Sequence, residues 1–163
     1  MGFKSLPRRA VFVALALFTA GTAPATFAAD YVSQKGTWIL NKKESKIPPN
    51  SFTPIDTPTV VSLDDGTAIK LITYVMTGTG LEPGPTFDGH YDGKPYPFGK
   101  DATRTLLHVS PNSFRDDLKM NDGSSSTEVV TFTAGNAKMR AEGKYTDAKG
   151  KVSDYVQVWD KVQ

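Results

Sequence analysis

The sequence predicts a single all-β domain, an antiparallel up-and-down β-barrel of about eight or nine strands with little helix. Short runs of β-branched and aromatic residues alternate with Gly, Pro, Asn and Asp from residue 30 onward. No window of the sequence shows a sustained 3.6-residue periodicity. Strands of this kind fit an up-and-down barrel or a sandwich, and closing them into a barrel removes the free sheet edges that favour aggregation.

Nine segments are expected to be strands because each is short, rich in strand-forming residues and bounded by turn residues. In order, they are Gly36–Leu40, Thr59–Leu63, Thr67–Met76, Thr86–Tyr91, Thr103–Val109, Ser113–Met120, Glu128–Thr133, Ala137–Thr146 and Val152–Lys161. The residues between them include Asp-Gly and Gly-Asn pairs, which tolerate the positive φ of tight hairpins.

Two proline-rich stretches interrupt this pattern. Residues 42–58 carry four prolines and predict a long loop over one mouth of the barrel. Residues 83–97 form a second Pro- and Gly-rich stretch.

On the strand that begins at Ser113, Asp116 shares a face with Phe114 and Leu118. If that face points inward, Asp116 needs a hydrogen-bonded partner, because burying an ionised carboxylate alone is costly.

The first 28 residues predict a secretory signal peptide that precedes a barrel domain over residues 30–163. Basic residues between positions 4 and 9 are followed by an apolar run over 10–20, too short to span a bilayer. The expected location is therefore periplasmic or secreted.

Small residues at the end of the leader place cleavage after Ala28, with Ala25 and Ala29 as alternative sites. Twin-arginine export is less favoured than the general secretory route, because Pro7 precedes the Arg8-Arg9 pair.

Charge and cysteine content exclude several classes of function. The leader holds three of the 19 Lys and Arg residues, so its removal leaves 16 basic against 17 acidic residues. A net charge near −1 gives no electrostatic basis for binding nucleic acid. The absence of cysteine excludes disulfides, thiolate metal sites and cysteine nucleophiles.

The triplet Gly36-Thr37-Trp38 resembles the G-x-W motif of lipocalin and calycin barrels. This resemblance implies a lipocalin-like fold in which Trp38 closes one end of the barrel and packs under a basic side chain of the last strand. Lys161 is the candidate for that side chain.

The longer segment GTWILNKKESKIPP and the turn Asp92–Pro97 (DGKPYP) are similar to those of small exported bacterial proteins of uncharacterised function. That group implies the barrel fold and brings no activity with it, since function depends on sites and not on folds.

No catalytic constellation is predicted. The chain has two histidines and no G-x-S-x-G nucleophile motif, so we expect no enzyme activity and no cofactor. Asp88, His90 and Asp92 alternate along an extended segment, and His108 lies on another predicted strand. These four residues form a weak alternative, a divalent metal site, whereas turn chemistry explains the aspartates more simply.

Aromatic side chains with polar tips suit a pocket for an apolar or amphipathic molecule, although a filled core uses the same residues. The candidate ligand-binding residues are Trp38, Tyr74, Tyr91, Tyr96, Phe114 and Trp159. Tyr91 and Tyr96 are expected near the entrance, beside the loop over residues 42–58.

The expected function is thus binding of a small apolar or amphipathic molecule at the barrel mouth by a monomer. A protein-interaction or inhibitor module with a filled barrel is the alternative, although no particular protein partner is indicated. A metal-binding protein or enzyme is the third possibility. The first predicts a cavity of at least ~300 Å³. The second predicts an exposed apolar patch beside the proline-rich loops, and the third needs three metal ligands at one point.

Overall fold

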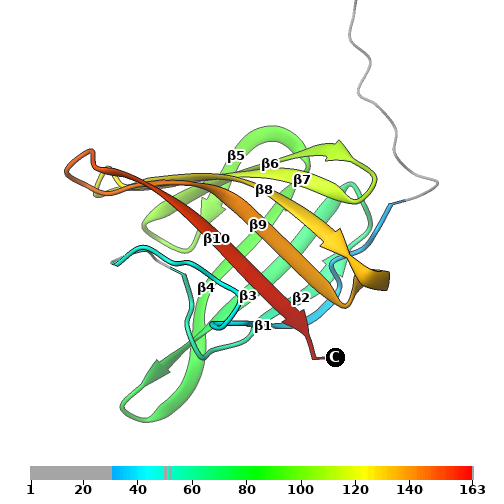
Figure 1. Cartoon of the computed structure of the whole chain (residues 1–163), viewed down its shortest axis with the longest axis horizontal. Helices are drawn as coiled ribbons and strands as arrows, with labels where there is room; N and C mark the ends of the chain where they lie inside the picture. Colours follow the sequence, from blue (N-terminus) through cyan, green and yellow to red (C-terminus); the bar gives the residue numbers. More distant parts are fainter. Residues whose placement is uncertain (1–30, 50, 52, 163) are drawn as a thin grey trace, which may run out of the picture.

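The computed structural model describes residues 31–49, 51 and 53–162, so the predicted signal peptide lies outside the described residues. Ten antiparallel strands close into one barrel in sequence order, with β1 pairing with both β2 and β10 (Figure 1). The strands are β1 Gly36–Leu40, β2 Thr59–Asp64, β3 Ala68–Thr77, β4 Gly80–His90, β5 Asp92–Phe98, β6 Ala102–Ser110, β7 Ser113–Met120, β8 Ser125–Thr133, β9 Lys138–Thr146 and β10 Val152–Lys161. One short 3-10 turn, η1 Ala134–Asn136, is the helical element of the described part.

The predicted antiparallel barrel is confirmed, with one strand more than expected. The additional strand is β5, and β4 begins at Gly80, six residues before the predicted start. Both segments hold prolines that argued against a strand. The structure accommodates them beside a sparse seam, because Phe87 and Phe98 are the one residue pair in register between β4 and β5. Proline lacks an N–H group and is tolerated where few ladder hydrogen bonds form.

The alternation of strand directions gives the barrel two different ends. The turns after β3, β5, β7 and β9 lie at one end, which we call the open end. The turns after β2, β4, β6 and β8 lie at the other, which we call the closed end. Within the described ranges, no helix is long and apolar enough to cross a bilayer.

The N-terminal segment covers the closed end. The backbone N–H of Val32 donates to the Pro111 carbonyl over 3.0 Å, and the Tyr31 hydroxyl donates to Asp64. The indole N–H of Trp38 donates to the Gln34 carbonyl over 2.7 Å. Trp38 is fully buried, at 0% exposure, and so forms part of the floor at this end.

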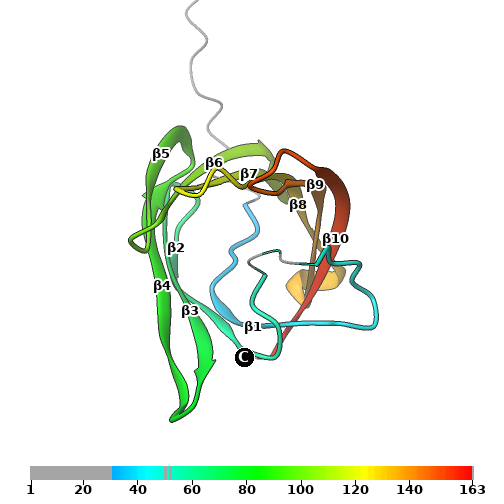
Figure 2. The ribbon, with the colours of Figure 1, turned by 90° about the vertical axis from the view of Figure 1, so that its left-hand side faces the viewer.

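The proline-rich loop returns the chain across the open end, as expected. Its first part extends the sheet beside β10 through a bridge between Lys46 and Val156. Further on, the Gln157 amide donates to the Thr53 hydroxyl over 2.7 Å. Figure 2 shows part of this loop within the outline of the ring of strands.

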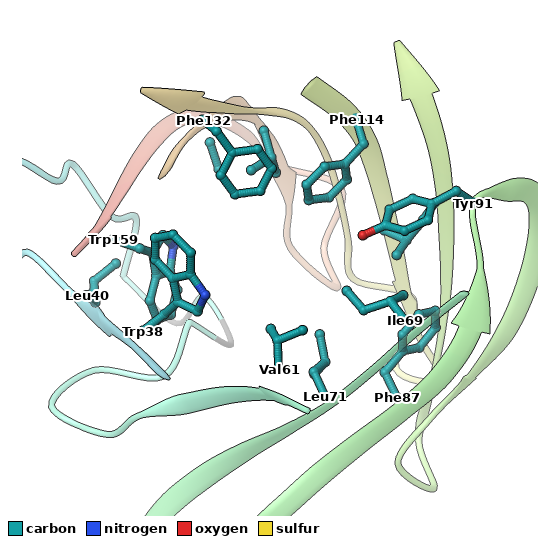
Figure 3. Close-up of a cluster of buried hydrophobic side chains, with 13 residues drawn as sticks. Trp38, Leu40, Val61, Ile69, Leu71, Phe87, Tyr91, Phe114, Phe132 and Trp159 are labelled. Carbon is teal, nitrogen blue, oxygen red and sulfur yellow. The ribbon is translucent and has the colours of Figure 1, made fainter. Parts of the chain in front are cut away.

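The core occupies the closed half of the barrel. Trp38, Phe132 and Phe114 form a chain of ring contacts with centroids 6.1 Å apart at each step, and Tyr91 continues it at 5.7 Å from Phe114. Figure 3 shows these side chains converging from different strands on the barrel interior, with Trp159 beside Trp38. Aromatic packing therefore fills this half, and the interior space lies toward the open end.

Candidate functional site

A cavity of about 120 Å³ lies inside the barrel. The part nearer the closed end is apolar and is formed by Val61, Leu71, Phe114, Val130 and Trp159. Toward the open end it meets a hollow of about 450 Å³ at the mouth. Thr53, Pro54, Thr73 and Phe98 line both spaces, so the cavity and the mouth are adjoining.

One wall of the cavity is polar, and strand register explains its composition. Asp116 on β7 pairs with Glu128 on β8, Glu128 pairs with Gly143 on β9, and Gly143 pairs with Tyr155 on β10. Residues in one such row share a face of the sheet, which here is the interior. Gly143 has no side chain between its neighbours, and the Tyr155 hydroxyl donates a hydrogen bond to Glu128 Oε2.

Arg104 on β6 forms an ion pair with Asp116. Its Nε lies 3.0 Å from Oδ1 and 2.9 Å from Oδ2 of the carboxylate, and Nη2 also donates to Oδ2. The side chains are 18% and 4% exposed. The Arg104 guanidinium carbon also lies 5.4 Å from the Phe87 ring centre and 5.6 Å from that of Phe98. The expectation that an inward Asp116 has a hydrogen-bonded partner is therefore confirmed.

Glu128 has no basic partner of its own in this wall. Burial is the largest cause that raises its pKa, from 4.5 to about 8, and the charge of nearby Asp116 acts in the same direction. The Tyr155 hydrogen bond and the Arg104 charge oppose this rise. The carboxyl group of Glu128 is therefore mostly protonated at neutral pH.

Two of the six predicted ligand-binding residues line the cavity, namely Phe114 and Trp159. Trp38 lies at the closed end and contacts Phe132 and Lys161 instead. Tyr96 packs its ring edge-to-face with Phe87, with centroids 6.4 Å apart. Tyr74 is half-buried on β3 and is not among the lining residues of either space.

Tyr91 belongs to a hydrogen-bonded cluster at the closed end and not to the entrance. Its hydroxyl contacts Asp64 at 3.3 Å, and its ring stacks on His108 with centroids 4.2 Å apart. Asp64 also accepts hydrogen bonds from Tyr31 and from the Gln34 N–H, while burial raises its pKa. This cluster ties the N-terminal segment to the barrel wall.

The four residues of the metal hypothesis are not brought together. Asp88 forms an ion pair with Lys70 at 2.7 Å, and exposed His90 packs against the Tyr96 ring. Asp92 accepts hydrogen bonds from Lys94 and Tyr96. His108 Nε2 lies 2.9 Å from the Gly66 carbonyl oxygen. Across the described ranges, no three His, Cys, Asp or Glu side chains are grouped to hold a metal ion.

Sequence reasoning missed most of the polar wall. Arg104, Glu128 and Tyr155 occupy alternate, inward positions on their strands, but nothing in their local sequence separates them from outward polar residues. The one available signal was Asp116, whose apolar neighbours on the same face suggested an inward acid that needs a hydrogen-bonded partner.

Comparison with known proteins adds no functional assignment. No protein-family model and no curated protein matches the chain. Among solved structures, the chain is similar to one described as a "putative beta-lactamase from Burkholderia vietnamiensis", with 13% sequence identity and a TM-score of 0.38. That similarity covers 86% of this chain and 100% of the other. A likeness at this level carries no argument about function, which has to come from the cavity itself.

Proposed function

We propose that the protein is a non-catalytic, exported binding protein that holds a small amphipathic molecule inside its barrel. The observation that supports this proposal is the cavity itself, which has an apolar floor, one polar wall and an adjoining mouth. Ligand sites combine apolar surfaces with a few convergent polar groups in this way. Export and a monomeric state are part of the proposal and rest on the leader-like first 28 residues and on the closure of the barrel edges.

The volumes indicate the size of the molecule. The inner cavity of about 120 Å³ is below the ~300 Å³ expected of a pocket for a drug-sized ligand. It is comparable to the roughly 150 Å³ cavity that accommodates benzene in an engineered protein. A ligand with a single ring fits this space, and any further apolar part would extend into the mouth.

Native mass spectrometry of the mature protein purified from periplasm tests this function, followed by denaturing analysis of any bound molecule. Ser126→Phe fills part of the cavity, because Ser126 lines it. Thr127→Phe is the matched control, since Thr127 is exposed and points away from the interior on the same strand. We expect a bound organic molecule in the wild type and in Thr127→Phe, and its loss in Ser126→Phe. Empty wild-type protein would contradict the proposal.

One observation supports the protein-interaction alternative. The hairpin of β3 and β4 extends beyond the barrel (Figures 1 and 2) and leaves Val75, Met76 and Leu81 exposed at 37%, 65% and 48%. Grouped apolar side chains on a projecting hairpin suit contact with another protein. If proteins of the cell envelope bind the Ser126→Phe variant but not a Met76→Ser, Leu81→Ser double variant, the result would favour this function.

A further inference from the structure

The cavity wall holds more acidic groups than basic ones. Three of the residues that line the cavity are of the types Arg, Lys, Asp or Glu, namely Arg104, Asp116 and Glu128. Arg104 is engaged by both oxygens of Asp116, so the pair is close to neutral. Glu128 is then the acid without a matching cation, and its described hydrogen-bond donor is the neutral Tyr155 hydroxyl.

The groups that face Glu128 come from each strand packed around it. Asp116 is its neighbour on β7, Arg104 lies beyond it on β6, and Tyr155 reaches it from β10. Ser126 on the same strand and Tyr145 on β9 line the cavity on the side of the mouth. None of these residues supplies a second positive charge.

Aromatic side chains line the cavity beside aliphatic and uncharged polar residues. Phe98, Phe114, Tyr145, Tyr155 and Trp159 all line the same space. The negative faces of aromatic rings attract organic cations, and the attraction is larger where water is excluded. A cavity that holds a carboxyl group and several aromatic rings is thus complementary to an ammonium group on an apolar body.

We infer that the molecule bound in this cavity is an organic cation, an amine with an apolar body of about one ring, whose ammonium group pairs with Glu128. The inference rests on the proposed binding function and specifies its ligand class. An anion fits less well, because Arg104 is the one cationic side chain among the described residues that line the cavity, and both oxygens of Asp116 already engage it. An anion would therefore gain no ion pair and would lie near the negative charge of Asp116. A neutral alcohol gains the apolar contacts but not the ion pair.

Binding of the cation should release a proton from Glu128. In the empty protein at neutral pH, the Glu128 carboxyl group holds a proton for most of the time. When the protonated amine binds, the ion pair favours the carboxylate, and the proton of the carboxyl group leaves to solvent. The amine keeps its own proton, so close to one proton is released for each molecule bound near pH 6.5.

Isothermal titration calorimetry with three one-ring probes tests the inference on the mature protein. Benzylamine carries the cation, benzyl alcohol is its neutral counterpart and benzoate is the anion. We expect benzylamine to bind at least about tenfold more tightly than benzyl alcohol, and benzoate to bind most weakly. Titrations in two buffers with different heats of ionisation should give the proton release directly.

Glu128→Gln should remove the preference for benzylamine, so that the variant binds benzylamine and benzyl alcohol within about twofold of each other, because the amide keeps the shape of the side chain without its charge. The matched control is Glu142→Gln, since Glu142 is exposed and pairs with Arg140 on the outer face of β9. It should bind all three probes as the wild type does.

A second measurement needs no variant. The wild-type affinity for benzylamine should rise with pH by up to about tenfold per unit between pH 6 and the pKa of Glu128, while that for benzyl alcohol stays constant.

Equal binding of amine and alcohol, or tightest binding of benzoate, would overturn the cation inference and leave the binding function standing. The same holds if the purified protein carries a molecule that is not a cation. If no probe binds and the purified protein is empty, the binding function itself fails.

Discussion

The Lys161 ammonium group lies 5.4 Å from the centre of the Trp38 indole ring. The two residues are direct cross-strand partners between β10 and β1, so their side chains share a face of the sheet at the closed end. This contact joins the first and last strands of the barrel where the ring of strands closes. It is the pairing that the resemblance to G-x-W barrels implied for these two residues.

Lys161→Ala should therefore reduce the free energy of unfolding by about 0.5–1 kcal/mol through loss of the cation–π contact. Lys161→Arg should retain most of this stability, because a guanidinium also packs on an indole face. Denaturant unfolding of both variants measures the difference, with exposed Lys151→Ala as the control. If the Ala and Arg variants are equally stable, the contact contributes nothing.

Gly143 holds a position that no other residue can take without displacing the backbone. A Cβ there would lie 2.0 Å from the Thr127 carbonyl oxygen and 2.8 Å from the Glu128 Cβ. Gly143→Ala should cost at least about 3 kcal/mol, because rotating a side chain cannot relieve a clash with backbone. Gly78→Ala is the matched control, since nothing lies within 4 Å of its Cβ position, and it should change stability by less than about 0.5 kcal/mol. Thermal unfolding that ranks the two variants equally would refute this explanation.

The Arg104–Asp116 pair should show strong coupling in a double-mutant cycle. Asp116→Leu alone leaves a guanidinium that is 18% exposed without its carboxylate and should cost about 3–5 kcal/mol. Combining it with Arg104→Met removes both charges, so the double variant should be more stable than Asp116→Leu alone. Additive effects of the two substitutions in urea unfolding would show that the ion pair is not the source of the cost.

The strands and turns could largely be predicted from the sequence, because β-branched runs and Asp-Gly turns act locally. Gly36–Leu40, Ser113–Met120 and Val152–Lys161 begin and end where the sequence predicts. The segment Asp92–Phe98 could not be predicted as a strand, because its prolines are compatible with a strand only beside the sparse seam with β4. That seam is a property of the closed barrel and not of the segment.

The polar wall of the cavity could not be predicted from the sequence for a related reason. Arg104 and Asp116 are twelve residues apart, and the row that joins Asp116, Glu128 and Tyr155 depends on the register of four strands. A shift of one residue in any of those strands would turn its side chain to the outer face. Inward polar residues can therefore be identified only once the register is known.

Glu128 should make the stability of the wild type fall as pH rises. Its pKa is raised from 4.5 to about 8 in the folded protein, chiefly by burial, so between these values the folded state holds a proton that the unfolded state has lost. The folded state then binds more protons, and the free energy of unfolding decreases with increasing pH by up to about 1.4 kcal/mol per unit.

Glu128→Gln lacks this titration, so its stability relative to the wild type should increase from about pH 5 to pH 8 and stay constant below pH 4. Urea unfolding at half-unit steps of pH measures the difference between the two proteins directly. Glu142→Gln serves as the control: Glu142 is exposed, and its hydrogen bond with Arg140 lowers its pKa, so its curve should run parallel to the wild type above pH 5. A Glu128→Gln curve that is parallel to the wild type over the same range would mean that Glu128 is ionised in the folded protein, and that the cavity already holds a negative charge before any ligand binds.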